Sequence, residues 1–100
     1  MRLARGERSG LESIARHALQ ARERTYATGD WRIAQAQSLL GAVLLAESRD
    51  AEAEPLMLAA DRVLRPVPGR QARERDANRA RLAALYTRQA RASSAIPNRR

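Results

Sequence analysis

Apolar residues recur along this chain with helical spacing, and no segment alternates apolar and polar residues as a strand would. The first predicted helix covers about 11–27, where Ser9 and Glu12 fit a capping box and Gly29 closes the far end. Its apolar stripe consists of Leu11, Ile14, Ala15, Ala18 and Leu19. We expect this stripe to face the core.

The second predicted helix covers 31–47, with Asp30 as its N-cap. Its second half, 39–46, is apolar nearly all round. A helix with this composition is expected to be covered on two sides by its neighbours.

The third predicted helix covers 50–64, with Asp50 as its cap. Pro55 falls within the first turn or so, where its missing N–H costs little. The stripe consists of Ala53, Leu56, Met57, Ala60, Val63 and Leu64. The helix is expected to end before Pro66, Pro68 and Gly69.

A fourth helix is predicted over about 71–90, and the segments 1–9 and 93–100 are expected to be disordered tails. The links between the predicted helices are short, so neighbouring helices should pack antiparallel. The sequence therefore predicts one all-α domain over 10–92.

The chain contains an internal repeat. A shift of 42 residues places LLGAVLL (39–45) on RLAALYT (81–87). The same shift places ARHALQAR (15–22) on MLAADRVL (57–64), with Ala18 on Ala60. The order is the second helix of one repeat, a complete helical pair, and the first helix of another.

These motifs resemble the tetratricopeptide repeat in its 42-residue form, found in kinesin light chains and bacterial regulatory proteins. The resemblance covers about 11–92 and is most specific over 31–66. The residues that carry the signature are Leu40, Gly41, Leu44, Ala53, Met57, Ala60, Pro66, Leu82, Ala83 and Tyr86. Ser48 departs from the pattern, because glycine usually closes the hairpin there, and Asp50 stands where an aromatic is common.

The resemblance implies a right-handed solenoid of stacked hairpins with a concave peptide-binding face. Small residues such as Gly41 and Ala53 would let the paired helices approach closely. Carried over by position, the concave face comprises Gln35, Ser38, Ala42, Leu45, Ala46, Ala77, Ala80, Ala84, Thr87 and Arg88. Such a surface suits an apolar helix or extended peptide, although the same alanines could instead contact further helices of an array. Both interpretations stay open.

The composition gives catalysis little support. The chain has no Cys and no Lys, and its only histidine, His17, lies beside the apolar stripe of the first helix. No metal-ligand spacing or phosphate-binding glycine loop is present, so no enzyme activity, metal or cofactor is expected. Trp31 is interpreted as packing on the preceding hairpin rather than facing a ligand.

The net charge is +8, and all 19 basic residues are arginine. Arginines of the fourth helix and its link favour nucleic-acid binding as an alternative, but Glu74 and Asp76 interrupt them and no stacking aromatic is interleaved. The arginines in question are Arg70, Arg73, Arg75, Arg79 and Arg81. Solvated surface arginines are the simpler interpretation, and nucleic-acid binding is not expected.

The sequence thus predicts a non-catalytic protein–protein interaction module, the terminal piece of a longer repeat array. A second hypothesis is the regulatory C-terminal segment of a bacterial Ser/Thr protein kinase. Self-association is expected through the uncovered face of the fourth helix. No signal peptide or membrane span is recognisable, and a cytoplasmic location is expected.

Overall fold

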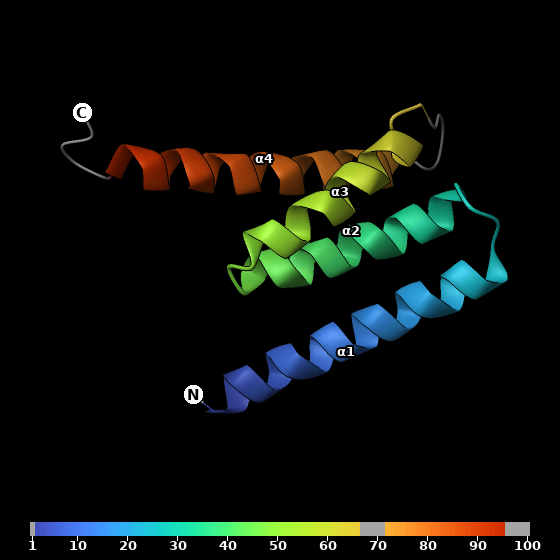
Figure 1. Ribbon diagram of the computed structural model, residues 1–100, viewed down its shortest axis with the longest axis horizontal. Coiled ribbons are helices and arrows are strands. Elements are labelled where there is room, and N and C mark those ends of the chain that lie inside the picture. Colours follow the sequence, from blue (N-terminus) through green and yellow to red (C-terminus); the bar gives the residue numbers. More distant parts are fainter. Residues whose placement is uncertain (1, 67–71, 96–100) are drawn as a thin grey trace.

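A computed structural model describes residues 2–66 and 72–95, with side chains over 10–66 and 72–92. Within these ranges the chain forms helices and no strand, which confirms the predicted all-α class (Figure 1). The helices are α1 (Arg2–Thr25), α2 (Trp31–Ala46), α3 (Asp50–Leu64) and α4 (Ala72–Ala95).

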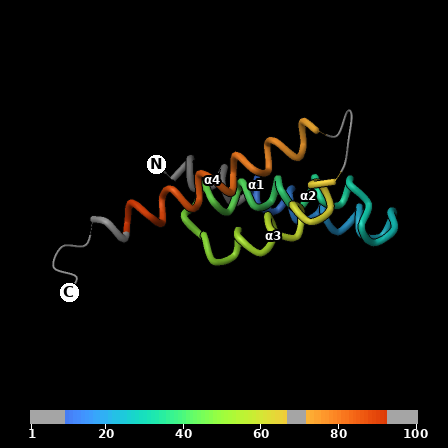
Figure 2. Tube along the Cα trace, turned by 90° about the horizontal axis from the view of Figure 1, so that it is seen from above, coloured from blue at the N-terminus to red at the C-terminus, as the bar shows by residue number. Residues whose placement is uncertain are grey.

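Each helix packs against the next one in the chain, and α2 also touches α4. The pairing of α2 with α3 is the most extensive, while α1 and α4 flank this pair on opposite sides (Figure 1). Figure 2, viewed from above, shows α3 lying to one side of α2. The α2–α3 hairpin is therefore the centre of the fold.

The helix α1 begins earlier than the sequence pattern indicates. It runs from Arg2 through Ser9 without a break, so the expected capping box is not its start. Glycine within a helix weakens it but does not stop it, and no proline interrupts this segment. The far end lies at Thr25, and Gly29 in the following link has a φ of 90°.

Asp30 caps α2 as predicted, because its side chain accepts a hydrogen bond from the Arg32 N–H at 2.9 Å. The other end closes on a left-handed residue, Ser48, with a φ of 62°. The Ser48 N–H donates to the Leu45 carbonyl at 3.0 Å, and the Arg49 N–H donates to the Leu44 carbonyl at 2.9 Å. This is the Schellman arrangement, in which glycine is the usual residue.

The prediction that Asp50 caps α3 is wrong. The N-cap is Arg49, which makes no capping hydrogen bond, and Asp50 is already helical. The Asp50 carboxylate instead pairs with Arg88 of α4. Pro55 is the sixth residue of α3 and lies beyond the first turn, on the exposed side.

The helix α4 continues to Ala95, farther than the predicted end at 90. Since 91–95 contains only small, polar and basic residues and no proline, nothing in it stops the helix. Residues 67–71, which include the predicted start of the fourth helix, and 96–100, which belong to the predicted C-terminal tail, lie outside the described residues.

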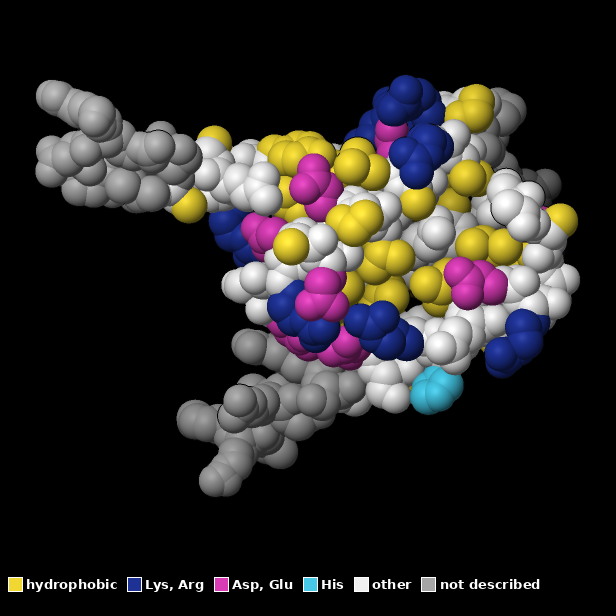
Figure 3. All heavy atoms as spheres, in the orientation of Figure 1, with side chains coloured by type: hydrophobic (Ala, Val, Ile, Leu, Met, Phe, Trp, Pro, Cys, Tyr) yellow, Lys and Arg dark blue, Asp and Glu magenta, His cyan; other side chains and the backbone are white. Residues whose placement is uncertain are grey.

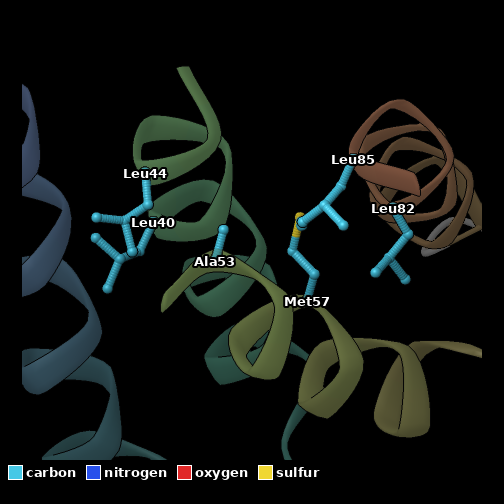
Figure 4. Close-up of a cluster of buried hydrophobic side chains, with 6 residues drawn as sticks. All are labelled: Leu40, Leu44, Ala53, Met57, Leu82 and Leu85. Atoms are coloured by element: carbon cyan, nitrogen blue, oxygen red, sulfur yellow. The ribbon is translucent and has the colours of Figure 1, made fainter. Parts of the chain in front are cut away.

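The main core lies between α2 and its three neighbours. Leu40 and Leu44 point from α2 toward α1, whereas Met57 of α3 points toward Leu85 of α4 (Figure 4). Gly41 lies against Met57: a Cβ atom built on it would be 2.6 Å from the Met57 Cγ. The glycine therefore permits the close approach of α2 and α3.

Most residues of the repeat signature are buried. The buried ones are Leu40, Gly41, Leu44, Ala53, Met57, Ala60 and Leu82. The exposed ones are Pro66, Ala83 and Tyr86. The exposed members of α4 correspond to buried Gly41 and Leu44 of α2, so one face of α4 lacks the cover that α2 has.

Trp31 packs against apolar residues, but not against the preceding hairpin, where the sequence interpretation placed it. It lies partly buried against a second apolar cluster of Ala34, Ala60 and Leu64, which joins α2 to α3 rather than to the preceding helix. The Arg32 guanidinium lies 3.8 Å from the Tyr26 ring centroid, in the link that follows α1. This stacking fastens the α1–α2 link to the start of α2.

Candidate protein-binding groove

An apolar groove of about 310 Å³ runs between α1 and α2. Leu11, Ile14 and Leu39 are 55%, 67% and 45% exposed, which is unusual for side chains of this size. The lining residues are Leu11, Ile14, Ala15, Ala18, Arg22, Ala36, Leu39, Ala42 and Val43. Arg22 supplies the only charge in this lining. The groove is therefore apolar apart from one cation, Arg22, in its lining.

The groove exists because α2 covers only part of the apolar stripe of α1. Ala15 and Leu19 pack against the main core, whereas Leu11 and Ile14 do not. The expectation that the whole stripe faces the core is therefore wrong. The stripe is wider than the surface of one neighbouring helix, so its remaining side lies open.

Arg22 is fixed in place by α2. Its guanidinium donates to the Arg32 carbonyl at 2.8 Å and to the Gln35 side-chain oxygen at 2.7 Å. Both acceptors lie near the start of α2, so these bonds set the separation of α1 and α2 at this end. The two hydrogen bonds of Arg22 therefore fix the geometry of this end of the groove.

A second hollow of about 300 Å³ lies where the α1–α2 link meets α3. Its lining is mixed, with Ile33 and Val63 beside the charged Glu23 and Arg62. Because apolar side chains and opposite charges alternate around it, it is less suited to an apolar helix than the groove between α1 and α2.

The predicted concave face follows α2 and α4, and the structure places its residues in different environments. Ser38 is buried, Gln35, Ala42, Leu45, Ala77 and Arg88 are partly buried, and Ala46, Ala80, Ala84 and Thr87 are exposed. Ala42 lines the groove beside α1. Gln35 bonds Arg22 of α1, whereas Ser38, Leu45 and Arg88 take part in hydrogen bonds between α2 and α4.

Two arginines of α4 bridge this junction. Arg81 donates to the Ser38 hydroxyl at 2.7 Å, and Arg88 donates to the Leu45 carbonyl at 3.0 Å. Ser38 is only 2% exposed, so its hydroxyl serves the helix contact. The Ser38 hydroxyl and the Leu45 carbonyl therefore already have hydrogen-bond partners within the chain, which leaves them less available to a bound peptide.

Two buried polar residues were not anticipated from the sequence. Asn78 is fully buried and its side-chain N–H donates to the Met57 carbonyl at 2.9 Å, while its Oδ1 has no hydrogen-bond partner among the described residues. Asp61 is 7% exposed and pairs with Arg65 and, at 3.7 Å, with Arg79. Asn78 joins α4 to α3 through its bond to Met57. Asp61 joins α3 to α4 through Arg79 and also pairs with Arg65 at the end of α3. An isolated polar residue in a charged helix gives no signal of burial.

Charged residues form a cluster where α1 meets the α2–α3 turn. Arg49 pairs with Glu12 at 2.7 Å, with Glu47 at 3.0 Å and with Glu52 at 2.8 Å. Hydrogen bonds from Arg49, and then from Arg16, lower the pKa of Glu12, and the Arg49 hydrogen bond lowers the pKa of Glu52. Figure 3 shows such mixed basic and acidic clusters around apolar side chains on one face.

The α4 arginines that favoured nucleic-acid binding are largely engaged with other groups. Arg75 pairs with Asp76 at 3.1 Å, Arg79 approaches Asp61, and Arg81 bonds Ser38. Arg73 is exposed, and Arg70 lies outside the described residues. Arg79 and Arg81 thus have partners on α3 and α2, whereas the partner of Arg75 lies on α4 itself.

His17 is exposed on α1, and no group of three or more His, Cys, Asp or Glu side chains is gathered for a metal ion within the described ranges. None of the helices in the part of the chain described has the length and apolar content needed to cross a membrane.

Comparison of the chain with protein-family models, with curated proteins and with solved structures finds no match in any of the three.

Proposed function

We propose that this chain is a non-catalytic protein–protein interaction module of the tetratricopeptide type, which binds an apolar helical segment in the groove between α1 and α2. The observation that carries the proposal is the exposure of Leu11, Ile14 and Leu39 along one apolar channel. A channel lined in this way favours an amphipathic helix, whose apolar side chains at helical spacing would fill it.

The way the helices meet supports the repeat part of the proposal. Ala15 of α1 packs against the core to which α2 contributes Leu40 and Leu44, and its counterpart 42 residues on, Met57, contacts α4. In particular, the Tyr86 hydroxyl donates to Glu54 at 2.7 Å, and the Asn78 side chain bonds Met57. The packing of α1 on α2 and of α3 on α4 supports an arrangement of stacked hairpins.

The proposal is tested by selecting ligands from a displayed library of random helical peptides. Peptides with an apolar stripe are expected to be enriched on the parent protein. Their affinity for Ile14→Glu, measured by fluorescence anisotropy, should fall at least about tenfold, because the glutamate places a charge in the apolar groove.

Gln20→Glu is the matched control, since it adds the same charge on an exposed face of α1 outside the groove. Its affinity should equal that of the parent. Failure to enrich any striped peptide, or equal binding by Ile14→Glu and the parent, would contradict the proposal.

A further inference from the structure

Two surfaces, one on α1 and one on α4, lack a partner among the described residues. In the repeat they correspond to the surfaces through which α3 and α2 pair with each other. Within the chain, α2 and α3 pair through Gly41, Ala53 and Met57. A shift of 42 residues relates α1 to α3 and α2 to α4. In its described part, the chain therefore carries one uncovered face on α1, which has the pattern of α3, and one on α4, which has the pattern of α2.

On α1, the exposed residues match the ones that α3 buries against α2. Ala53 corresponds to Leu11, Leu56 to Ile14, and Ala60 to Ala18. Ala53 and Ala60 are fully buried and Leu56 is partly buried, whereas their counterparts are all exposed and line the groove. The groove side of α1 thus has the position of a helix-pairing surface.

On α4, exposed residues correspond to buried or partly buried residues of α2, among them Gly41, which lies against Met57 of α3. Ser38, Gly41 and Leu45 of α2 are buried or partly buried. Their counterparts, Ala80, Ala83 and Thr87, are all exposed. Tyr86, which is 43% exposed, lies beside this face and is held by Glu54.

We infer that α4 of one copy docks into the α1–α2 groove of a second copy and pairs with α1 there as α2 pairs with α3. This inference rests on the proposed function, because it names the occupant of the same groove. The occupant is a second copy of this chain, and the contact joins two different surfaces.

The side chains that would meet in this contact are matched in size. In the α2–α3 pair, Gly41 leaves room for the long Met57 side chain. In the pair between copies, Ala83 would take the place of Gly41 and Ala15 that of Met57. One methyl group is added on one helix and a long side chain is removed on the other. This leaves space for Leu11, which is larger than its counterpart Ala53, while Ile14 has the same size as its counterpart Leu56.

The charges also match at one end of the contact. Ala34 and Leu64 pack in one cluster at the open end of the α2–α3 pair. Their counterparts are Asp76 and Arg22. The exposed Asp76 of one copy would therefore meet the single cation that lines the groove of the other. An apolar contact that ends in an opposite-charge pair also fixes the register.

The two helices are long enough for such a contact. Both α1 and α4 have 24 residues, whereas α2 has 16 and α3 has 15. The additional residues lie at the start of α1 and at the end of α4, and these ends would be adjacent in an antiparallel pair. The contact between copies can therefore be longer than the hairpin it copies.

Because each copy keeps one groove and one α4 face free, the contact is heterologous and propagates head to tail. Sedimentation velocity of the full chain should show a series of species that grows with concentration rather than a single dimer. The net charge of +8 opposes association, so the series should shift to larger species at higher salt.

Two single variants test the polarity of the contact. Ile14→Glu blocks the groove and leaves α4 intact, while Ala83→Glu blocks α4 and leaves the groove intact. Each alone should weaken self-association at least about tenfold, because each buries a charge in the contact. A mixture of the two retains one functional pair and should form a one-to-one dimer that does not grow.

Circular dichroism checks that both variants remain helical, and Gln20→Glu serves as the control that should assemble like the parent. A parent chain that stays monomeric at about 1 mM, where a binding free energy of only about 4 kcal/mol would be detected, overturns the inference. A parent that stops at a dimer, or variants that do not restore each other, would also overturn it. If striped peptides still bind the groove of such a monomer, the proposed function stands and only the self-docking is wrong.

Discussion

Gly41 and Met57 lie so close that a Cβ atom on the glycine would be 2.6 Å from the Met57 Cγ and 3.2 Å from its sulfur. Both residues are buried in the core of the fold. The absence of a side chain at position 41 is therefore what allows the central hairpin to close.

Gly41→Leu is expected to lower the free energy of unfolding by about 1–3 kcal/mol or more, because the added side chain overlaps Met57 and the helices must separate. Urea denaturation followed by circular dichroism measures the change. Adding Met57→Ala should recover part of the loss, since it removes the atoms that clash.

Ala83→Leu is the matched control for this experiment. It changes the repeat-equivalent position of α4, which is exposed, and should alter the stability of the monomeric chain by no more than about 0.5 kcal/mol. Equal losses at positions 41 and 83 would show that the close approach of α2 and α3 does not limit stability.

Ser48→Gly is expected to stabilise the chain. The serine holds a φ of 62°, where an L-residue with a Cβ is strained. Relief of this strain, less the entropy cost of glycine, should raise the free energy of unfolding by about 0.5–1 kcal/mol. Chemical denaturation measures it.

The control for Ser48→Gly is Gln20→Gly, which introduces the same residue at an exposed helical position. There the stability should fall by about 0.5–1 kcal/mol, because glycine disfavours the helix interior. Loss of stability in both variants would mean that the left-handed turn at position 48 is not strained.

Acid should weaken the contact between α1 and the α2–α3 turn. Hydrogen bonds from Arg49 hold the pKa of Glu12 and Glu52 below the usual 4.5. A lowered folded-state pKa gives a contribution that is present above about pH 4.5 and is lost as the pH falls through the folded-state value. Stability should therefore decline on acidification.

Arg49→Met removes the largest cause of the lowered pKa of both carboxylates and leaves Arg16 in place, so the fall in stability between neutral and acid pH should become shallower. Thermal unfolding measured at several pH values reports this slope. Arg24→Met, which changes an exposed arginine elsewhere on α1, should retain the parental slope. An unchanged slope in Arg49→Met would show that the charged cluster around Arg49 is not the source of the acid sensitivity.

Tyr86 should titrate above the ordinary tyrosine range, because its hydroxyl donates to the Glu54 carboxylate and this bond raises the pKa of Tyr86. A raised folded-state pKa gives stability that is present below about pH 10 and is lost as the pH rises through the folded-state value. Absorbance at the tyrosinate band measures it, in a Tyr26→Phe background.

Glu54→Gln removes the charge that opposes ionisation of Tyr86, and the pKa of Tyr86 should fall toward 10. Glu23→Gln, an exposed glutamate on α1, is the control and should leave the titration unchanged. A parental Tyr86 that already titrates near 10 would show that this bond does not persist in solution.

The sequence by itself determined the features that depend on residues close together in the chain. Periodic apolar positions predicted the helices, Asp30 predicted the start of α2, and the small residues Gly41 and Ala53 predicted a close pairing. Each of these depends on local hydrogen bonding, side-chain spacing or side-chain size, which can be read from a short window.

The tertiary structure alone decided which surfaces are covered. In the folded chain, Ser38 is buried and bonds Arg81, and Ile14 is exposed on the α1 stripe. Asp50 pairs with Arg88 instead of capping α3. These outcomes depend on which helices meet and at what separation, and partners such as Ser38 and Arg81 lie 43 positions apart in the chain. The pattern along one helix marks its apolar side, but only its neighbours determine how much of that side remains exposed.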